Sequence, residues 1–169
     1  MDALEVILTR RSIRQYQDMA VREELIEKVL AAAMSAPSAR NAQPWQFVVV
    51  TDRKILQQMS KINPNAAMAA RAPLGILVCG DLRLELSAGY WVVDCAAAAQ
   101  NLLLAAHALG LGAVWTGIYP RQERMAGFHR LLGLPEEVLA HSLIVLGYPA
   151  ERPKSQDRYQ RERVHRNGW

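Results

Sequence analysis

The 169-residue chain has only two cysteines, Cys79 and Cys95, and neither has the spacing of a metal or redox site. They lie in an apolar and an alanine-rich run, so we expect small buried side chains in a reducing compartment. Residues 1–20 carry charges throughout and lack the apolar segment of a signal peptide, which points to the cytoplasm. The apolar content of 51% is enough to bury the core of one domain spanning residues 1–169.

Most motifs that mark a catalytic or cofactor site are also missing. There is no GxGxxG and no P-loop, which removes the usual dinucleotide and triphosphate cradles. The four histidines are scattered without an HExxH pair, so no metal site is expected. No serine, cysteine or threonine stands in a recognisable nucleophile motif. We therefore expect the chemistry to belong to a bound cofactor.

Lysine is scarce, because 16 of the 20 basic side chains are arginine and the net charge is +4. The planar guanidinium suits phosphate, so such a chain could hold a phosphorylated ligand, although a biased genome composition would give the same count. Nucleic-acid binding is the alternative for the basic C-terminus. The interspersed Glu151, Asp157 and Glu162, and the lack of a nucleic-acid motif, disfavour it.

Hydrophobic periodicity predicts helices and short strands in alternation along the chain. The predicted helices cover residues 2–10, 22–34, 52–61, 89–109, 121–132 and 134–140. The predicted strands cover residues 47–51, 74–80, 113–116 and 142–148. This order predicts an α+β or α/β sandwich with helices around one small sheet.

The helix predicted over residues 89–109 is apolar on almost every side. Four polar residues, Asp94, Gln100, Asn101 and His107, would each need a partner in lipid, so we do not expect it to span a membrane. A helix that is apolar all round must instead be enclosed by protein. Because a chain of this size has little material to wrap it, we predict a homodimer with this helix at or near the interface.

The C-terminal segment, residues 151–169, has six cations, three acids and almost no aliphatic side chains. Such a composition cannot fold alone, and a solvated, disordered end is one interpretation. Trp169 argues against it, since a ring of that size is usually packed on something. A tail that docks across a dimer partner would satisfy both observations.

Three further segments could carry a binding site. In TRRSIRQY, the cations and the Ser12 hydroxyl could cradle a phosphate, although cations at a helix C-terminus would give the same pattern. In PSARNAQPW, the amides of Asn41 and Gln43 could read the polar edge of a heterocycle, although a surface turn would need similar residues. Gly117, after Trp115 and Thr116, would let a ligand approach the backbone.

Together, these segments resemble the FMN-dependent nitroreductase family, as a compact member. The resemblance rests on RRSIRQY, APSARNAQPWQFVVVTD, DCAAAAQNLLLAAHALGLGAVWTG, LIVLGYPAERPK and VHRNGW in this order. It covers nearly the whole chain apart from residues around 60–88. It implies a nitroreductase-like three-layer α+β sandwich, in which helices flank a small mixed or antiparallel sheet and one long helix is buried.

The same resemblance implies a homodimer with two FMN sites in the interface and with tail 151–169 on the partner subunit. NADH or NADPH would reduce the flavin, and a nitroaromatic, quinone or other small acceptor would reoxidise it. The implied phosphate and pyrimidine contacts of one subunit are Arg10, Ser12 and Arg14, with Arg11 alongside. The implied wall from the other subunit is Pro37, Ser38, Ala39, Asn41 and Gln43.

The resemblance also places the Thr116–Gly117 segment against the flavin N5, and a basic residue of the tail, Lys154 or Arg158, on the phosphate. The tail departs from the usual alternating Lys and Arg, because Ser155, Gln156 and Asp157 intervene. Three related functions share the scaffold: reductive dehalogenation, oxygen-dependent flavin fragmentation and non-catalytic flavin carriage. The first two usually carry extra lid segments, and a short chain favours an open flavin face with broad acceptor choice.

Overall fold

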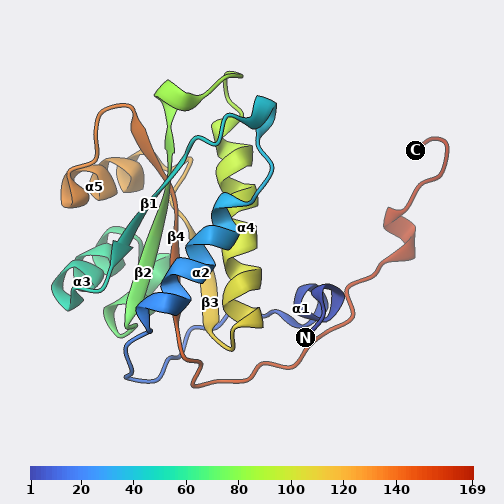
Figure 1. The fold of residues 1–169 in the computed structure, drawn as a ribbon, viewed down its shortest axis with the longest axis horizontal. Coiled ribbons are helices and arrows are strands. Elements are labelled where there is room, and N and C mark those ends of the chain that lie inside the picture. The colour runs from blue at the N-terminus through green and yellow to red at the C-terminus, as the bar shows by residue number, and fades with distance from the viewer.

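A computed structural model describes all residues, 1–169, and its centre is a four-stranded sheet (Figure 1). The strands are β1 (Trp45–Val50), β2 (Leu74–Asp81), β3 (Gly112–Gly117) and β4 (Val138–Gly147). Their order is β1-β2-β4-β3, and every neighbouring pair is antiparallel. The two central strands are almost entirely buried because helices cover both faces of the sheet. β1 and β3 form the two outer edges.

Five α-helices surround the sheet. They are α1 (Ala3–Thr9), α2 (Glu23–Met34), α3 (Arg53–Ile62), α4 (Trp91–Ala108) and α5 (Gln122–Leu132). Short 3₁₀ turns cover Ala39–Asn41, Pro64–Ala70, Leu82–Leu84 and Arg161–Arg163. In Figure 1, α2 and α4 lie on one side of the sheet, and α3 and α5 lie on the other. The predicted three-layer α+β sandwich is confirmed.

The alternation of side chains along β2 and β4 divides the interior into two cores. Ile76 of β2 and Ile144 of β4 belong to the core under α2 and α4. Their neighbours Leu77 and Leu143 belong to the core under α3 and α5, since successive strand residues point to opposite faces. The sheet is therefore packed on both faces, and this packing fixes the positions of its two edge strands, β1 and β3.

One predicted element was wrong. Residues 134–140 were expected to form a helical turn, but Val138–Ala140 begin β4 and pair with Cys79–Asp81 of β2. The partner strand decides the outcome, because the end of β2 has backbone groups that need pairing within the sheet. The predicted cap at Asp52 is confirmed, since its carboxylate accepts from the backbone N–H groups of Lys54 and Ile55.

Helix α4 is the longest helix and runs beside the sheet, with eight of its 18 residues buried (Figure 1). Cys95 on this helix and Cys79 on β2 are free and buried, as predicted, and burial raises the pKa of the Cys79 thiol to about 12. Val93 remains 61% exposed, so a single chain does not enclose the helix completely. None of the helices is both long enough and apolar enough to cross a bilayer.

The C-terminal tail, residues 152–169, leaves the body of the molecule and passes α1 (Figure 1). All of its residues are exposed, and Trp169 stacks only on His165, with ring centroids 4.3 Å apart. On α1, Leu4, Ile7 and Leu8 are also more than half exposed. One chain therefore leaves an apolar helix face and an extended tail on the same side.

Candidate functional site

The N-terminal arginine segment is held against the edge strand β3. Ser12 forms a parallel bridge with Ala113, and the Ile13 N–H donates to the Ala113 carbonyl at 3.0 Å. The start of the tail lies beside this segment, because the Glu151 carboxylate accepts from the backbone N–H groups of Arg14 and Gln15. The fold thus brings the two ends of the chain together at one edge of the sheet.

A pocket of about 360 Å³ opens between the end of α1 and the tail. Its lining includes Arg10, Arg11 and Arg158, and it does not include Lys154. Burial, together with the positive charges of Arg158 and Arg11, lowers the pKa of the Arg10 guanidinium. None of these arginines belongs to an ion pair. This concentration of cations, called here the arginine pocket, is suited to an anionic group.

Arg11 fastens the tail to the arginine pocket. Its guanidinium donates to the Lys154 carbonyl at 3.3 Å and to the Gln156 carbonyl at 3.1 Å. It also donates to the carbonyls of Leu8 and Arg10. With its donors largely committed to the backbone, Arg11 positions the tail and has little capacity left for a ligand.

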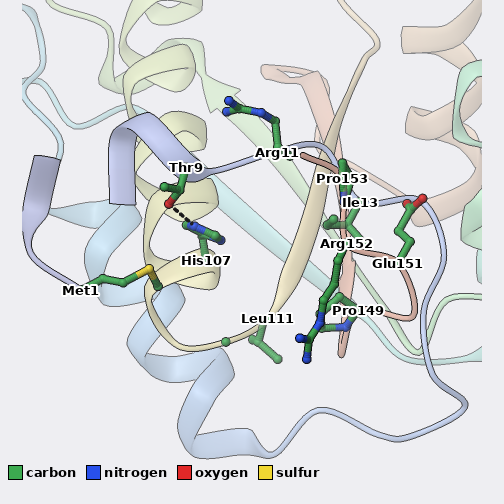
Figure 2. A pocket seen from close by; sticks show the side chains of 11 residues that line it. Met1, Thr9, Arg11, Ile13, His107, Leu111, Pro149, Glu151, Arg152 and Pro153 are labelled. Atoms are coloured by element: carbon green, nitrogen blue, oxygen red, sulfur yellow. Dashed lines mark hydrogen bonds between the residues drawn. The ribbon is translucent and has the colours of Figure 1, made fainter. Parts of the chain in front are cut away.

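A second pocket, of about 270 Å³, also has Arg11 in its lining (Figure 2). Thr9 and His107 both line it and lie in contact, with 2.9 Å between the threonine Oγ1 and the histidine Nε2. Burial and the nearby Arg10 and Arg11 lower the pKa of His107. This contact ties the end of α1 to the last turn of α4 and fixes the position of the arginine segment.

The proline-bounded segment, Pro37–Pro44, forms a loop with an unusual backbone. Arg40, Asn41 and Gln43 have φ of 53°, 57° and 49°, in the left-handed region that side chains other than glycine rarely adopt. The Gln43 side-chain amide donates to the Asn41 Oδ1 at 2.8 Å. Both amides are exposed at the loop surface. A strained conformation that is held in place is more typical of a functional loop than of a simple surface turn.

Within one chain, this loop and the arginine pocket lie far apart. Ala39 contacts Asp94 near the start of α4, and Thr9 contacts His107 near its end. Thirteen residues of helix correspond to about 20 Å. The loop precedes the edge strand β1, whereas the arginine segment runs along β3 at the opposite edge (Figure 1).

Gly117 ends β3 on an open surface. A Cβ placed there would meet nothing within 4 Å, and its φ is outside the left-handed region, so neither packing nor backbone geometry requires glycine. Its carbonyl accepts from the Asn63 side chain at 3.2 Å and from Arg124 at 3.0 Å. The neighbouring Thr116 is buried and donates its hydroxyl to the Leu143 carbonyl, which leaves only its backbone for a ligand.

Sequence reasoning missed Asn63 and Arg124. Asn63 lies 54 positions from Gly117 and Arg124 lies seven positions after it, and no local pattern marks either residue. It also missed a cluster in which His141 lies beside Trp91 and Trp115, with ring centroids 6.1 and 5.5 Å away. Burial lowers the pKa of His141 to about 4, so it is neutral at pH 7. No three metal-binding side chains gather anywhere in the structure.

The arrangement at β3 fits an elongated ligand with a phosphate at one end and a flat ring at the other. Cations gather beside Ser12, which pairs with Ala113, and the unshielded backbone of Gly117 follows four residues along the strand. Four strand residues span about 13 Å. FMN has both features, and its phosphate would meet the arginine pocket while its ring meets the open backbone.

Comparison with known proteins agrees with the resemblance in the sequence. The model of the nitroreductase family matches residues 7–81 and 63–148. A Methanothermobacter thermautotrophicus protein named "Putative NADH dehydrogenase/NAD(P)H nitroreductase" is 53% identical over 169 residues, which cover 100% of this chain and 88% of that protein.

Two solved structures have the same fold. A Parabacteroides distasonis protein with that same name is 43% identical, with a TM-score of 0.94 over 98% of both chains. The FMN complex of a "putative nitroreductase" from Desulfovibrio desulfuricans is 33% identical, with a TM-score of 0.84 over 98% of this chain and 96% of that one. The family expected from the sequence is thereby confirmed. This chain belongs to the nitroreductase family.

Proposed function

We propose that two copies of this chain bind two FMN molecules in their interface and use them to reduce small acceptors with NADH or NADPH. The observation that carries the proposal is the separation of the predicted ligand contacts. The arginine pocket and Gly117 line one edge of the sheet, while loop Pro37–Pro44 lies at the other. Within one chain this loop lies about 20 Å along α4 from the arginine pocket, whereas the loop of a second copy can complete the site.

One subunit holds the flavin tail and the N5 edge. Arg10 and Arg158 bind the phosphate, because they are the cations that line the pocket without being committed to backbone carbonyls. Ser12 and Arg14 supply the remaining phosphate and pyrimidine contacts of this subunit. Gly117 offers its backbone to the ring, and the donors on its carbonyl hold that peptide in place.

The partner subunit supplies the wall. Pro37, Ser38 and Ala39 line the ring, and the amides of Asn41 and Gln43 meet its polar edge. Each amide can both donate and accept, which suits the alternating donors and acceptors of a flavin pyrimidine. The strained loop is already formed in the single chain, so little ordering is needed when the ligand binds.

Dimerisation covers the apolar surface that one chain leaves open. The exposed α1 residues Leu4, Ile7 and Leu8 and the α4 residue Val93 are the candidate contacts. The C-terminal segment, residues 151–169, packs on the partner subunit and gives Trp169 an apolar surface. Burying such side chains stabilises the dimer by about 25 cal/mol for each Å² of apolar surface removed from water.

When bound, FMN supplies the redox chemistry, taking a hydride from NADH or NADPH and then reducing a nitroaromatic, quinone or similar acceptor in a ping-pong cycle. The chain's own residues bind and orient it. Arg14 contributes positive charge near the pyrimidine, which favours negative charge developing there. The cytoplasm, where both nucleotides are available, is the proposed location.

The test is the visible spectrum of the purified protein, before and after excess FMN, followed by anaerobic addition of NADH or NADPH. We expect a flavin spectrum that bleaches with the nucleotide and returns when a quinone is added. Light scattering at micromolar concentration should give the mass of a dimer. A protein that stays colourless with excess FMN contradicts the binding site, and a flavin spectrum that neither nucleotide bleaches makes the protein a carrier.

A further inference from the structure

The loop Pro37–Pro44 needs an anchor, because its backbone would not adopt this shape unaided. Arg40 and Gln43 have positive φ although neither side chain favours the left-handed region, and Asn41 between them is the only type that tolerates it well. Such conformations persist only where surrounding contacts over-determine them. The contacts that hold this loop therefore decide whether its amides are correctly placed.

Besides backbone bonds within the loop and one from the Asp81 N–H to the Pro44 carbonyl at its end, three hydrogen bonds use a side chain to hold the loop. The Asp94 Oδ1 accepts from the Ala39 N–H at 2.9 Å, and the Ser38 Oγ accepts from the Gln43 N–H at 3.0 Å. The Arg40 guanidinium donates to the Leu86 carbonyl at 3.1 Å. Ser38 belongs to the loop itself and Arg40 is exposed. Asp94, which is 4% exposed, is the one side chain from outside the loop that accepts a hydrogen bond from the loop backbone.

Asp94 has no competing structural role. The first backbone N–H of α4, on Trp91, is capped by Glu85 at 3.0 Å, so the helix does not need Asp94 as its cap. Asp94 also belongs to none of the three ion pairs. A buried carboxylate without a cation is unfavourable unless other groups compensate for it. Here the start of α4 and the Ala39 N–H supply that compensation.

We propose that Asp94 is a positioning residue that clamps loop Pro37–Pro44 so that Asn41 and Gln43 are ready to contact FMN. It acts through the Ala39 N–H and does not touch the ligand. The clamp joins α4, the most buried helix of the fold, to the loop that completes the neighbouring site. The packed helix therefore restrains the backbone of the loop. The effect on FMN rests on the proposed function, whereas the clamp itself can be measured without a ligand.

The experiment removes either partner of the clamp in the full-length protein. Asp94→Ala deletes the acceptor. Ala39→Pro deletes the donor at a position that suits proline, since Ser38 before it is extended, with φ −142° and ψ 155°. FMN dissociation constants are measured by quenching of flavin fluorescence. We expect each single variant to bind FMN about tenfold more weakly, and the double variant to bind no more weakly than either single one.

Two further variants separate positioning from general stability. Asp94→Asn keeps an oxygen acceptor and should restore FMN affinity to within about threefold of the original protein. Asn101→Ala removes a 3.1 Å hydrogen bond from the same helix to the Ala32 carbonyl of α2 and should leave FMN affinity unchanged. Hydrogen exchange of the Ala39 amide in the FMN-free protein should be slow in the original and in Asn101→Ala, and fast in Asp94→Ala.

The outcomes are distinct. Unchanged FMN affinity in Asp94→Ala, or an equal loss in Asn101→Ala, overturns the positioning role, as does additive loss in the double variant. If the original protein binds no FMN, the proposed function fails, and unchanged Ala39 exchange in Asp94→Ala then overturns the clamp as well. Should Asp94→Ala fail to fold, Asp94→Leu removes the same acceptor while filling the buried site, and its FMN affinity and Ala39 amide exchange, compared with those of Asn101→Ala, decide the matter.

Discussion

Replacing Gly117 by alanine separates the requirements of the fold from those of the ligand. In the single chain, the added methyl group would meet no atom within 4 Å and would sit on a backbone that alanine can adopt. Alanine also restricts the unfolded chain, which stabilises a protein by about 0.4–1 kcal/mol at compatible positions. We therefore expect the FMN-free variant to be at least as stable as the original.

The same methyl group would occupy the space in which we place the flavin ring. Forcing an extra methyl into a packed contact costs about 1–3 kcal/mol. Since 1.4 kcal/mol is a factor of ten, FMN should bind about fivefold to 150-fold more weakly to Gly117→Ala. Titration of flavin fluorescence gives the dissociation constant, and urea denaturation of the FMN-free protein gives the free energy of unfolding.

Gly112→Ala is the matched control on the same strand. A Cβ at Gly112 would lie 2.7–2.9 Å from three atoms of Ile13, so this variant should lose stability even without ligand. The contrast between the two glycines is the critical result. If Gly117→Ala binds FMN as tightly as the original protein, the ring does not lie against this backbone, and the placement of the site along β3 is wrong.

Further predictions concern charge, pH and thiol reactivity. Arg158→Gln should weaken FMN binding about tenfold or more, because it removes a charge-assisted hydrogen bond to the phosphate. The FMN-free variant should lose no stability, because Arg10 and Arg158 repel each other. Unchanged FMN affinity would exclude Arg158 from the phosphate site. Burial lowers the pKa of His141 from 6.5 to about 4, so between these pH values the unfolded chain binds more protons than the folded protein. The free energy of unfolding should therefore fall by up to about 3 kcal/mol as the pH drops from 6.5 to about 4. Urea denaturation across this range should show a smaller fall in His141→Gln, and equal slopes would contradict the assignment. Cys79 and Cys95 should react with a thiol reagent at pH 8 only after unfolding, because both are buried and burial raises the pKa of both thiols. Rapid reaction of either thiol in the native protein would contradict this prediction.

Local patterns in the sequence were sufficient to predict the five α-helices, because the apolar spacing and the capping residues that define a helix lie within a few turns of one another. The apolar spacing in α2, the Asp52 cap of α3 and the alanine-rich run of α4 all predict what the structure contains. Residues 134–140 failed because the decisive partner is distant. A proline and acids near the start resemble a helix, but β2 needs Val138–Ala140 as its neighbour.

The candidate site was predictable only in part for the same reason. Three arginines within five residues predicted a binding segment, since their repulsion favours an anionic ligand. The sequence left Lys154 and Arg158 undecided, and folding places Arg158 beside Arg10 while the Lys154 backbone is held by Arg11. The role of Asp94 was likewise hidden, because its partner Ala39 lies 55 positions away.

The sequence by itself determined the family, the alternation of helices and strands, and the residue types that favour a phosphorylated ligand, because each of these is written in short segments. The tertiary structure decided how those segments are distributed in space. It put the arginine pocket and Gly117 on one sheet edge and the strained loop on the other, since strand order and antiparallel pairing depend on contacts between distant parts of the chain. That distribution is the physical reason why we propose that a second copy completes the site.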